Sequence, residues 1–266
     1  MTLDALELVL FWLAAGGYVA AWIFYLSGWR SNASHVLLTG TLVMTAAFTA
    51  HTAMVGLRWY RADHVPFLSA FEFVTFFAFL VAMVFLLFSI REKNRALGVF
   101  LLPVVLSLML YAAFLNRVVE PEIPIFSSLL LKLHVLTTLF GYSAWSITFA
   151  SSVCYLYLER RPGATPGMFD LLAYRAAFFA FCFLTLGILT GALWGDRVFG
   201  QLWFWDPKET WSFITWLIFM AYLHARYTLE WRGRRAAILA IVGFAAVLFT
   251  YVGVDFLLPQ IHGVQN

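Results

Sequence analysis

The segment WGDRVFGQLWFWDPKETW, Trp194–Trp211, lies between two long apolar runs and is unusual in being rich in both aromatic and charged residues. Its eighteen positions hold four tryptophans, two phenylalanines, two glycines and five charged residues. A membrane span avoids so many charges, and a hydrated loop avoids so much aromatic surface. We therefore expect an amphipathic aromatic cap at the membrane surface, whose aromatic faces receive a flat apolar ligand. The alternative is an aromatic belt that only anchors the flanking helices.

The composition is that of a membrane protein. The 266 residues are 63% hydrophobic and 12% charged, whereas ordinary globular proteins are about one quarter charged. The net charge of +3 gives no support for nucleic-acid binding. Cys154 and Cys182 lie in different apolar runs without a C-x-x-C motif, so we expect packed thiols. No cleavable signal peptide is evident, because the first apolar run has the length of a span and lacks a basic flank.

Eight apolar runs are long enough, or nearly so, to cross ~30 Å of hydrocarbon at ~1.5 Å per residue. They lie near Leu6–Gly28, Val36–Leu57, Pro66–Ile90, Gly98–Leu115, Leu129–Leu158, Leu171–Leu193, Thr210–Ala225 and Ala236–Leu258. We therefore predict an all-α polytopic membrane protein of about eight transmembrane helices with an extracytoplasmic Trp-rich cap. It forms a single membrane domain over residues 1–266, with the cap at residues 194–211.

The distribution of lysine and arginine predicts the orientation. Eleven of the seventeen basic residues fall in one set of alternate loops: Arg30, Arg91, Lys93, Arg95, Arg160, Arg161, Arg175, Arg226, Arg232, Arg234 and Arg235. The other six are Arg58, Arg61, Arg117, Lys132, Arg197 and Lys208. Cytoplasmic loops carry the excess of basic residues. Both termini and the aromatic cap are therefore expected outside the cytoplasm.

Two histidines are expected on the same membrane face as the cap, His134 and His262. Neutral imidazole is a usual axial ligand of haem iron, and two imidazoles on opposite sides give six-coordinate iron. A haem site beside the aromatic platform is therefore one interpretation. The other is that both are interfacial histidines hydrogen-bonded to lipid or to neighbouring residues.

Two further histidines fall inside spans, where ionisable residues are functional candidates. His51 is expected about 9 Å and His224 about 21 Å below the outer face. Two axial nitrogens on one iron are only about 4 Å apart. His224 therefore needs another partner, for which a second subunit is one source, and His51 is interpreted as a structural hydrogen-bonding residue.

The acidic residues are expected to have structural roles. Asp206, Pro207 and Glu209 match the N-cap, N1 and N3 positions of a helix start. Glu72 lies early in the third span, where it can pair with Arg58 or Arg61. The sequence has no Ser-His-Asp arrangement, glycine-rich phosphate loop or H-E-x-x-H motif, so we assign no catalytic residue.

The segment WFWDPKETWS, Trp203–Ser212, followed by ITWLIFMAYLHAR through Arg226, resembles the WWD signature of the CcsA/ResC cytochrome c-type biogenesis proteins. These are integral membrane haem-handling proteins of system II. Three more segments resemble the family: RWYRADHVPFLSAFE (Arg58–Glu72), KLHVLTTLFGY (Lys132–Tyr142) and GVDFLLPQIHG (Gly253–Gly263). Ser69 and Phe71 stand where the family has Asn and Tyr, and Phe199 where it often has Trp.

The resemblance implies a set of haem-binding residues. It implies that His134 and His262 are axial ligands of a haem on the outer face, and that His224 is a transmembrane histidine used while haem crosses. A partner membrane protein of the CcsB/ResB type supplies the opposing intramembrane histidine. The candidate cofactor-binding residues are His134, His262, His224, Trp194, Trp203, Trp205 and Asp206.

The resemblance also implies a function in cytochrome c maturation. The chain would move haem b, bound transiently, across a bacterial inner (plasma) membrane or its thylakoid equivalent. As part of a cytochrome c haem lyase it would support attachment to apocytochrome c, whose C-x-x-C-H motif supplies the thiols and a replacement histidine. One alternative is a b-type haem electron-transfer membrane subunit, which favours paired histidines at equal depth. Another is a solute transporter, which favours helices broken by Gly or Pro and charges near the midplane.

Overall fold

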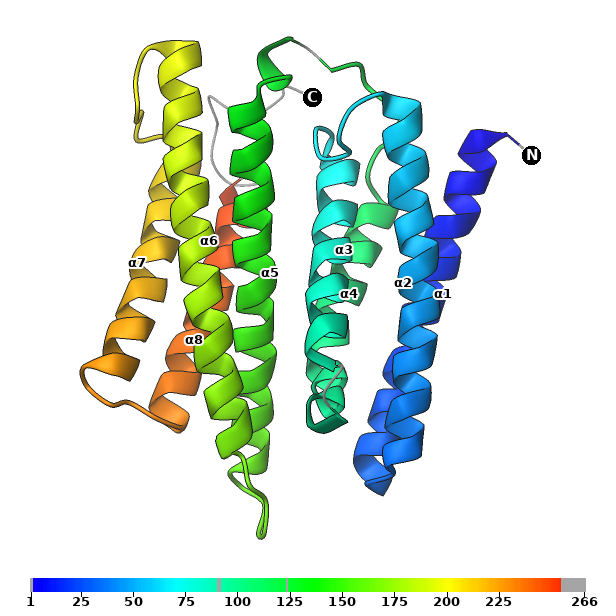
Figure 1. Ribbon diagram of the computed structural model, residues 1–266, viewed down its shortest axis with the longest axis vertical. Helices are drawn as coiled ribbons and strands as arrows, with labels where there is room; N and C mark the ends of the chain where they lie inside the picture. Colours follow the sequence, from blue (N-terminus) through cyan, green and yellow to red (C-terminus); the bar gives the residue numbers. More distant parts are fainter. Residues whose placement is uncertain (1, 90–91, 123, 255–266) are drawn as a thin grey trace. The chain divides into compact units, whose positions relative to one another are not determined.

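The structure of the chain, a computed structural model, describes residues 2–89, 92–122 and 124–254 (Figure 1). In these ranges it contains eight α-helices and no β-strand. The helices are α1 (Leu3–Ser31), α2 (Ser34–Ala62), α3 (Ala70–Ser89), α4 (Gly98–Ala113), α5 (Leu129–Leu158), α6 (Gly167–Phe199), α7 (Pro207–Tyr227) and α8 (Arg234–Leu248). Two 3-10 turns, η1 (Glu92–Leu97) and η2 (Pro124–Phe126), and a π-helical turn, η3 (Phe249–Gly253), accompany them. The predicted all-α fold is confirmed.

Among the described residues, six helical stretches are long and apolar enough to cross a membrane, which confirms the prediction of a multi-pass membrane protein. They are Leu3–Ser31, Ser34–Ala62, Ala70–Ser89, Arg95–Ala113, Gly167–Phe199 and Arg234–Tyr251. The other two expected spans, α5 and α7, are not among the six. α5 buries a series of hydroxyl side chains that lower its hydropathy: Ser143, Ser146, Thr148, Ser151 and Ser152. α7 has charged or ionisable residues in both its first and its last turn.

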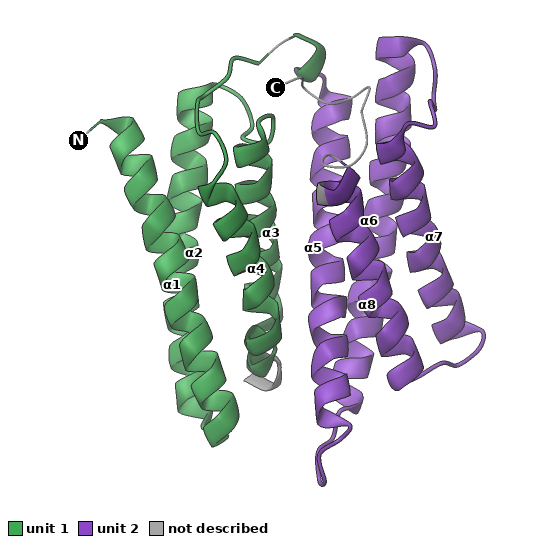
Figure 2. Cartoon of the chain, turned by 180° about the vertical axis from the view of Figure 1, so that it is seen from behind, with its two compact units in different colours: residues 1–126 green, residues 127–266 purple. Residues whose placement is uncertain are grey.

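The chain divides into two compact units, residues 1–126 and residues 127–266 (Figure 2). The first unit contains α1 to α4, and the second contains α5 to α8. Each unit has its own core of fully buried aromatic side chains. The single membrane domain expected over residues 1–266 stays a prediction.

In the first unit, α1 and α2 form an antiparallel hairpin (Figure 1). Asn32 ends α1 in the left-handed conformation, with φ of 53°, and its N–H donates to the carbonyl of Gly28. Asn is one of the few residues that tolerate this conformation. Tyr25 of α1 is fully buried and donates to the hydroxyl of Thr41 at 3.1 Å. A Cβ on Gly98 would lie 2.5 Å from the Tyr25 ring, so a glycine there allows α4 to start against α1.

A buried arginine joins several elements of the first unit. Arg58, at the end of α2, is 1% exposed. Its Nε donates to Glu72 of α3 at 2.8 Å, and its Nη1 donates to Glu7 of α1 at 3.2 Å. Its Nη1 and Nη2 also donate to the carbonyls of Arg117 and Val118, at 2.7 and 2.9 Å. Arg58 therefore ties three helices to the segment that follows α4.

Glu72 also determines where α3 begins. Its Oε2 accepts from the backbone N–H groups of Leu68 and Ser69, at 3.1 and 3.2 Å. The Ser69 hydroxyl in turn accepts from the N–H of Glu72 at 3.2 Å. This reciprocal arrangement is a capping box, which satisfies backbone donors at a helix start. The helix therefore begins at Ala70, four residues later than the predicted start at Pro66.

In the second unit, α5 packs against both α6 and α8. Trp145 of α5 is fully buried, and its Nε1 donates to the carbonyl of Ala240 at 3.0 Å. Its ring stacks on Phe219 of α7, with centroids 3.4 Å apart and planes 6° from parallel. A Cβ on Gly243 would lie 2.5 Å from the Trp145 ring, so this glycine lets α8 contact α5 closely.

The Arg58 network predicts a difference between two charge-removing substitutions. Arg58→Ala leaves Glu72 buried without a cation, while Glu7 keeps only Arg61, so the free energy of unfolding should fall by about 3–5 kcal/mol. Asp4→Asn removes an exposed partner of Arg61, with a side chain 78% exposed, and should cost less than about 1 kcal/mol. Unfolding by SDS titration in mixed micelles measures both. Equal losses in the two variants would contradict the role of Arg58.

Candidate functional site

The first residues of the Trp-rich segment are helical. α6 continues to Phe199, whereas the sequence predicts the end of this span at Leu193. Asp196 and Arg197 are exposed, so the helix extends past the apolar run without burying their charges. Gly200 ends α6 in the left-handed conformation, with φ of 74°, and donates to the carbonyl of Asp196 at 2.9 Å. The apolar run alone therefore underestimates the length of this helix.

Two carboxylates fix the turn into α7. Asp206 accepts from the N–H of Glu209 at 2.7 Å, and Pro207 is the first helical residue. Glu209 reaches back and accepts from the N–H of Phe204 at 2.7 Å. The predicted N-cap, N1 and N3 arrangement is confirmed. Asp206 is 3% exposed, and its predicted role in cofactor binding stays a prediction.

Trp205 has an unusual backbone conformation for an aromatic residue. Its φ is 57°, in the left-handed region, which costs a residue with a Cβ about 1–2 kcal/mol. Its side chain is 68% exposed, so its own packing does little to offset that cost. The hydrogen bonds of the neighbouring residues Phe204 and Asp206 hold the turn instead. The result is an indole exposed at the end of unit 2 where α6 ends.

The other two tryptophans assigned to the site are less exposed than Trp205. Trp194 is 7% exposed and packs edge-on against Phe199, with ring centroids 5.7 Å apart. Trp203 is half-buried and lies edge-on to Trp205, with centroids 5.9 Å apart. Within the described ranges, the buried Nε1 of Trp203 has no hydrogen-bond partner. A buried donor without an acceptor costs about 1–3 kcal/mol.

His134 lies near the start of α5 and is half-buried. Its Nδ1 is 2.7 Å from the carbonyl oxygen of Gly187 on α6. A carbonyl only accepts, so the proton is assigned to Nδ1 and the lone pair to Nε2. Metal-binding histidines commonly donate their second ring nitrogen to a carbonyl in this way. The arrangement therefore fits an iron ligand that binds through Nε2.

The start of α5, the end of α6 and the loop to α7 lie at the same end of unit 2 (Figure 1). α6 connects the elements, because it carries Gly187 and, further along the same helix, Trp194. The structure thus brings His134 and the Trp-rich segment to one end of one rigid helix pair.

His224 lies in the last turn of α7 and is exposed. It shares an exposed stripe with four residues: Leu217, Met220, Ala221 and Tyr227. Its Nδ1 is 3.4 Å from the hydroxyl of Thr228, a long contact for a hydrogen bond. Arg226 faces inward and donates to both carboxylate oxygens of Asp170, at 2.7 and 2.9 Å. This ion pair sets the rotation of the last turn, so that His224 faces away from unit 2.

The remaining histidines have different surroundings. His51 is fully buried, with its Nδ1 3.0 Å from the hydroxyl of Tyr18, as expected of a structural hydrogen-bonding residue. His64 contacts the carbonyl of Glu120 at 3.0 Å. His262 lies outside the described residues, and its ligand role stays a prediction. In the ranges that the structure describes, no three His, Cys, Asp or Glu side chains form a metal-binding group.

Sequence reasoning missed the contribution of α6 to the surroundings of His134. The carbonyl of Gly187 accepts a hydrogen bond from the imidazole Nδ1–H, and Gly191 lies against the same ring. The signal was present as a G-x-x-x-G spacing within an apolar run, which in membrane helices marks close helix contacts.

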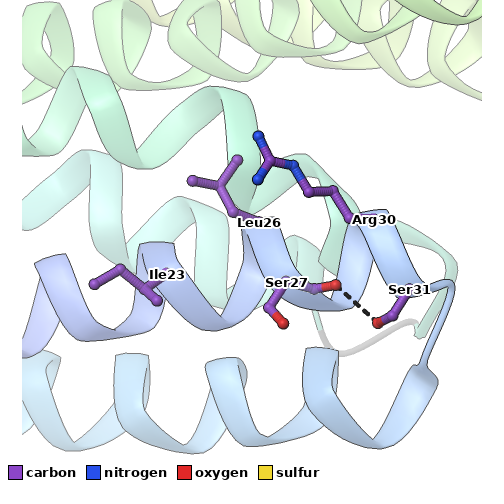
Figure 3. A pocket seen from close by; sticks show the side chains of 5 residues that line it. All are labelled: Ile23, Leu26, Ser27, Arg30 and Ser31. Carbon is purple, nitrogen blue, oxygen red and sulfur yellow. Dashed lines mark hydrogen bonds between the residues drawn. The ribbon is translucent and has the colours of Figure 1, made fainter.

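A hollow of about 490 Å³ lies elsewhere, beside α1 in the first unit (Figure 3). Its lining residues are Ile23, Leu26, Ser27, Arg30 and Ser31. The hydroxyl of Ser31 donates to the carbonyl of Ser27 at 2.8 Å, which is the dashed line in Figure 3. None of these residues is a candidate site residue.

The conformation of Trp205 leads to a prediction about stability. Trp205→Gly should leave the free energy of unfolding within about 1 kcal/mol, because relief of the left-handed strain offsets the entropy cost of glycine. Trp203→Gly should cost about 2 kcal/mol or more, because it removes a half-buried aromatic ring. Denaturation of purified variants, followed by near-UV circular dichroism, compares the two. A larger loss for Trp205→Gly would refute the assignment of strain.

Comparisons with known proteins show the family of the chain. The family model described as "Cytochrome C assembly protein" matches residues 67–262. "Cytochrome c biogenesis protein CcsA" of Chlamydomonas reinhardtii is 34% identical over 220 residues, covering 77% of this chain and 62% of its own. The protein of the same description from Synechococcus elongatus is 31% identical over 279 residues, covering 84% of this chain and 86% of its own.

A solved structure, "Cytochrome c Heme Lyase CcmF", matches with a TM-score of 0.77 and 19% identity, which shows a shared fold. The match covers 98% of this chain and 48% of that one. This chain thus spans about half of CcmF and less than two thirds of the Chlamydomonas relative. The family model, in contrast, covers most of the present chain. The chain belongs to the cytochrome c assembly protein family, as a CcsA-type cytochrome c biogenesis protein.

Proposed function

We propose that this chain, whose family gives it a role in cytochrome c maturation, moves haem b across the membrane and presents it to apocytochrome c. Haem is then a transiently bound substrate. The observation that carries the proposal is the contact between His134 and the carbonyl of Gly187. A half-buried imidazole with its Nδ1 proton fixed in this way is prepared to bind iron through Nε2.

His134 and His262 are the proposed axial ligands. Two neutral imidazoles hold haem iron in a six-coordinate state. Such ligation leaves no iron position for other molecules until one imidazole is exchanged. The histidine of the C-x-x-C-H motif of apocytochrome c, the client protein, is the proposed replacement. Exchange of one axial imidazole for this histidine would release the haem-bearing cytochrome from this chain.

The Trp-rich segment supplies the remaining contacts. The exposed indole of Trp205 offers an aromatic face to the porphyrin, and the half-buried ring of Trp203 packs beside it. Arg197 and Lys208 lie within the segment and are the proposed partners of the haem carboxylates. Trp194 is buried, so its proposed contribution is to support the aromatic surface from below.

The client supplies the thiols. In each attachment the S–H of a client cysteine adds across a haem vinyl group, so that sulfur bonds to one carbon and hydrogen to the other. The addition needs no net oxidant or reductant. Cys154 is fully buried in α5, and Cys182 lies within α6. The proposed task of this chain, as a subunit of a haem lyase, is therefore to hold and orient haem.

The exposed stripe of α7 supports a second membrane subunit as partner. An ionisable side chain facing lipid is costly, and such residues usually face a protein or a polar cavity. His224 lies in the last turn of α7 on an apolar stripe, facing away from the helices of unit 2. A helix of a CcsB/ResB-type partner with its own histidine would cover this stripe and provide the opposing ligand while haem crosses.

The proposed direction of transport requires a specific orientation. The excess of basic residues in alternate loops supports an orientation with both termini and the Trp-rich segment outside the cytoplasm. A reporter fused after Asn266 should therefore be exposed on the outer side, and one inserted at Lys93 on the cytoplasmic side. Labelling with a membrane-impermeant reagent measures both positions. The opposite pattern would overturn the proposed direction.

The ligand assignment predicts chemical rescue. His134→Gly should abolish cytochrome c maturation, because the iron then has an open or weakly held position. Added imidazole is small enough to enter the vacated space and should restore maturation in part. Haem-stained cytochrome c in cells measures the yield.

The buried His51 provides the control. It bonds to Tyr18 in the core of unit 1, so His51→Gly should lower the amount of folded protein and show no response to imidazole. Full maturation in His134→Gly without imidazole would refute the proposed ligand.

Purified protein should contain less than one haem per chain and lose it slowly. A permanent, stoichiometric haem would favour the electron-transfer alternative.

A further inference from the structure

We infer that Gly187 and Gly191 of α6 are positioning residues that orient the ring of His134 for iron binding through Nε2. The inference rests on the proposed function, because it concerns the same haem site. Its new element is that the orientation comes from two glycines of the neighbouring helix, neither of which touches the iron.

Gly191 provides the space in which the imidazole lies. A Cβ at this position would be 2.5 Å from Nδ1, 2.7 Å from Cε1 and 3.2 Å from Cγ of His134. Three ring atoms thus lie over the bare backbone of one glycine. Any other residue at this position would have to displace the ring, which is the movable part of the contact. Because the ring lies against the backbone of Gly191, this backbone limits the rotation of the ring.

Gly187 provides the hydrogen-bond acceptor and the helix spacing. Its carbonyl accepts from Nδ1 of His134 at 2.7 Å and from the hydroxyl of Thr190 at 3.1 Å. A Cβ on Gly187 would lie 3.1 Å from the backbone nitrogen of Thr138 and would also meet its hydroxyl oxygen. At Gly187 an added Cβ would meet backbone atoms of α5, which cannot move aside as a side chain can. A side chain at Gly187 would therefore separate α5 from α6.

The two glycines together determine which nitrogen binds iron. The carbonyl of Gly187 fixes the proton on Nδ1, and the ring cannot turn over without leaving both the acceptor and the space above Gly191. The lone pair is therefore on Nε2, in a fixed direction. A carbonyl acceptor also raises the basicity of the coordinating nitrogen.

Helix propensity works against glycine at both positions. In the middle of a helix, glycine is less favourable than alanine by about 0.5–1 kcal/mol. Gly191→Ala should therefore favour α6 as a helix while disturbing the ring of His134. A loss of haem binding in this variant would come from the ring contact and not from the helix.

The test compares Gly191→Ala with Gly56→Ala in the full chain, expressed with its membrane partner. Gly56 lies in α2, and a Cβ there would meet nothing within 4 Å. Gly191→Ala should lower haem content about tenfold or more, as for other residues that orient metal-binding histidines. The haem that remains should shift from the low-spin to the high-spin absorption spectrum, and added imidazole should reverse the shift. Gly56→Ala should match the parent in both measurements.

The double variant Gly191→Ala/His134→Gly tests whether the glycine acts through the histidine. With the ring absent, the added methyl group has room, so the double variant should accumulate as His134→Gly does, while its rescue by imidazole should be weaker because the methyl group fills part of the vacated space. A lower amount of folded protein in the double variant than in His134→Gly would show that Gly191 acts elsewhere and would overturn the inference. If Gly191→Ala fails to accumulate, recovery in the double variant supports the ring contact, and failure of both overturns it.

The two proposals fail separately. Normal maturation in His134→Gly would refute the haem-ligand role itself. Loss of maturation in His134→Gly, combined with unchanged haem content and spectrum in Gly191→Ala, would leave the ligand role intact and refute only the positioning role of the glycines.

Discussion

The close contact between α5 and α6 is the constraint on which the candidate site depends. In lipid there is no hydrophobic driving force between helices, so close association relies on small residues that let backbones approach. Gly141 of α5 provides such a contact, since a Cβ there would lie 3.0 Å from the backbone nitrogen of Leu184. Gly187 and Gly191 extend the contact along α6. The result is that His134 lies on the same helix pair from which the Trp-rich segment begins, and its ring is held by backbone atoms.

The Trp-rich segment combines a fixed backbone with an exposed aromatic surface. Asp206 and Glu209 are both occupied by backbone N–H groups, so the two carboxylates shape the turn and α7 starts at a defined point. This turn maintains the left-handed conformation of Trp205. The side chain is exposed, so its packing does not offset the backbone strain. Strain of this kind is concentrated at functional sites. In the proposed function, haem provides the missing contact surface for the indole.

The sequence predicted those features that depend on local chemistry. The Asp206 cap was predictable because its residues lie within one turn of each other, and the helices followed from apolar runs long enough to span a bilayer. The end of α6 was missed because the helix continues into polar sequence until Gly200 stops it. The contact between His134 and Gly187 was missed because it joins residues 53 positions apart, and only helix packing brings them together. His262 lies outside the described residues, so its place beside His134 stays a prediction.

The central claim is that His134 binds haem iron through Nε2, and pulsed electron paramagnetic resonance tests it most directly. Protein containing histidine labelled with ¹⁵N only at Nε2 is purified with ferric haem, and the nitrogens bound to iron are identified from their couplings. The expected result is two labelled axial nitrogens in the parent and one in His134→Gly supplied with unlabelled imidazole. Two labelled axial nitrogens in both proteins, or none in the parent, would contradict it.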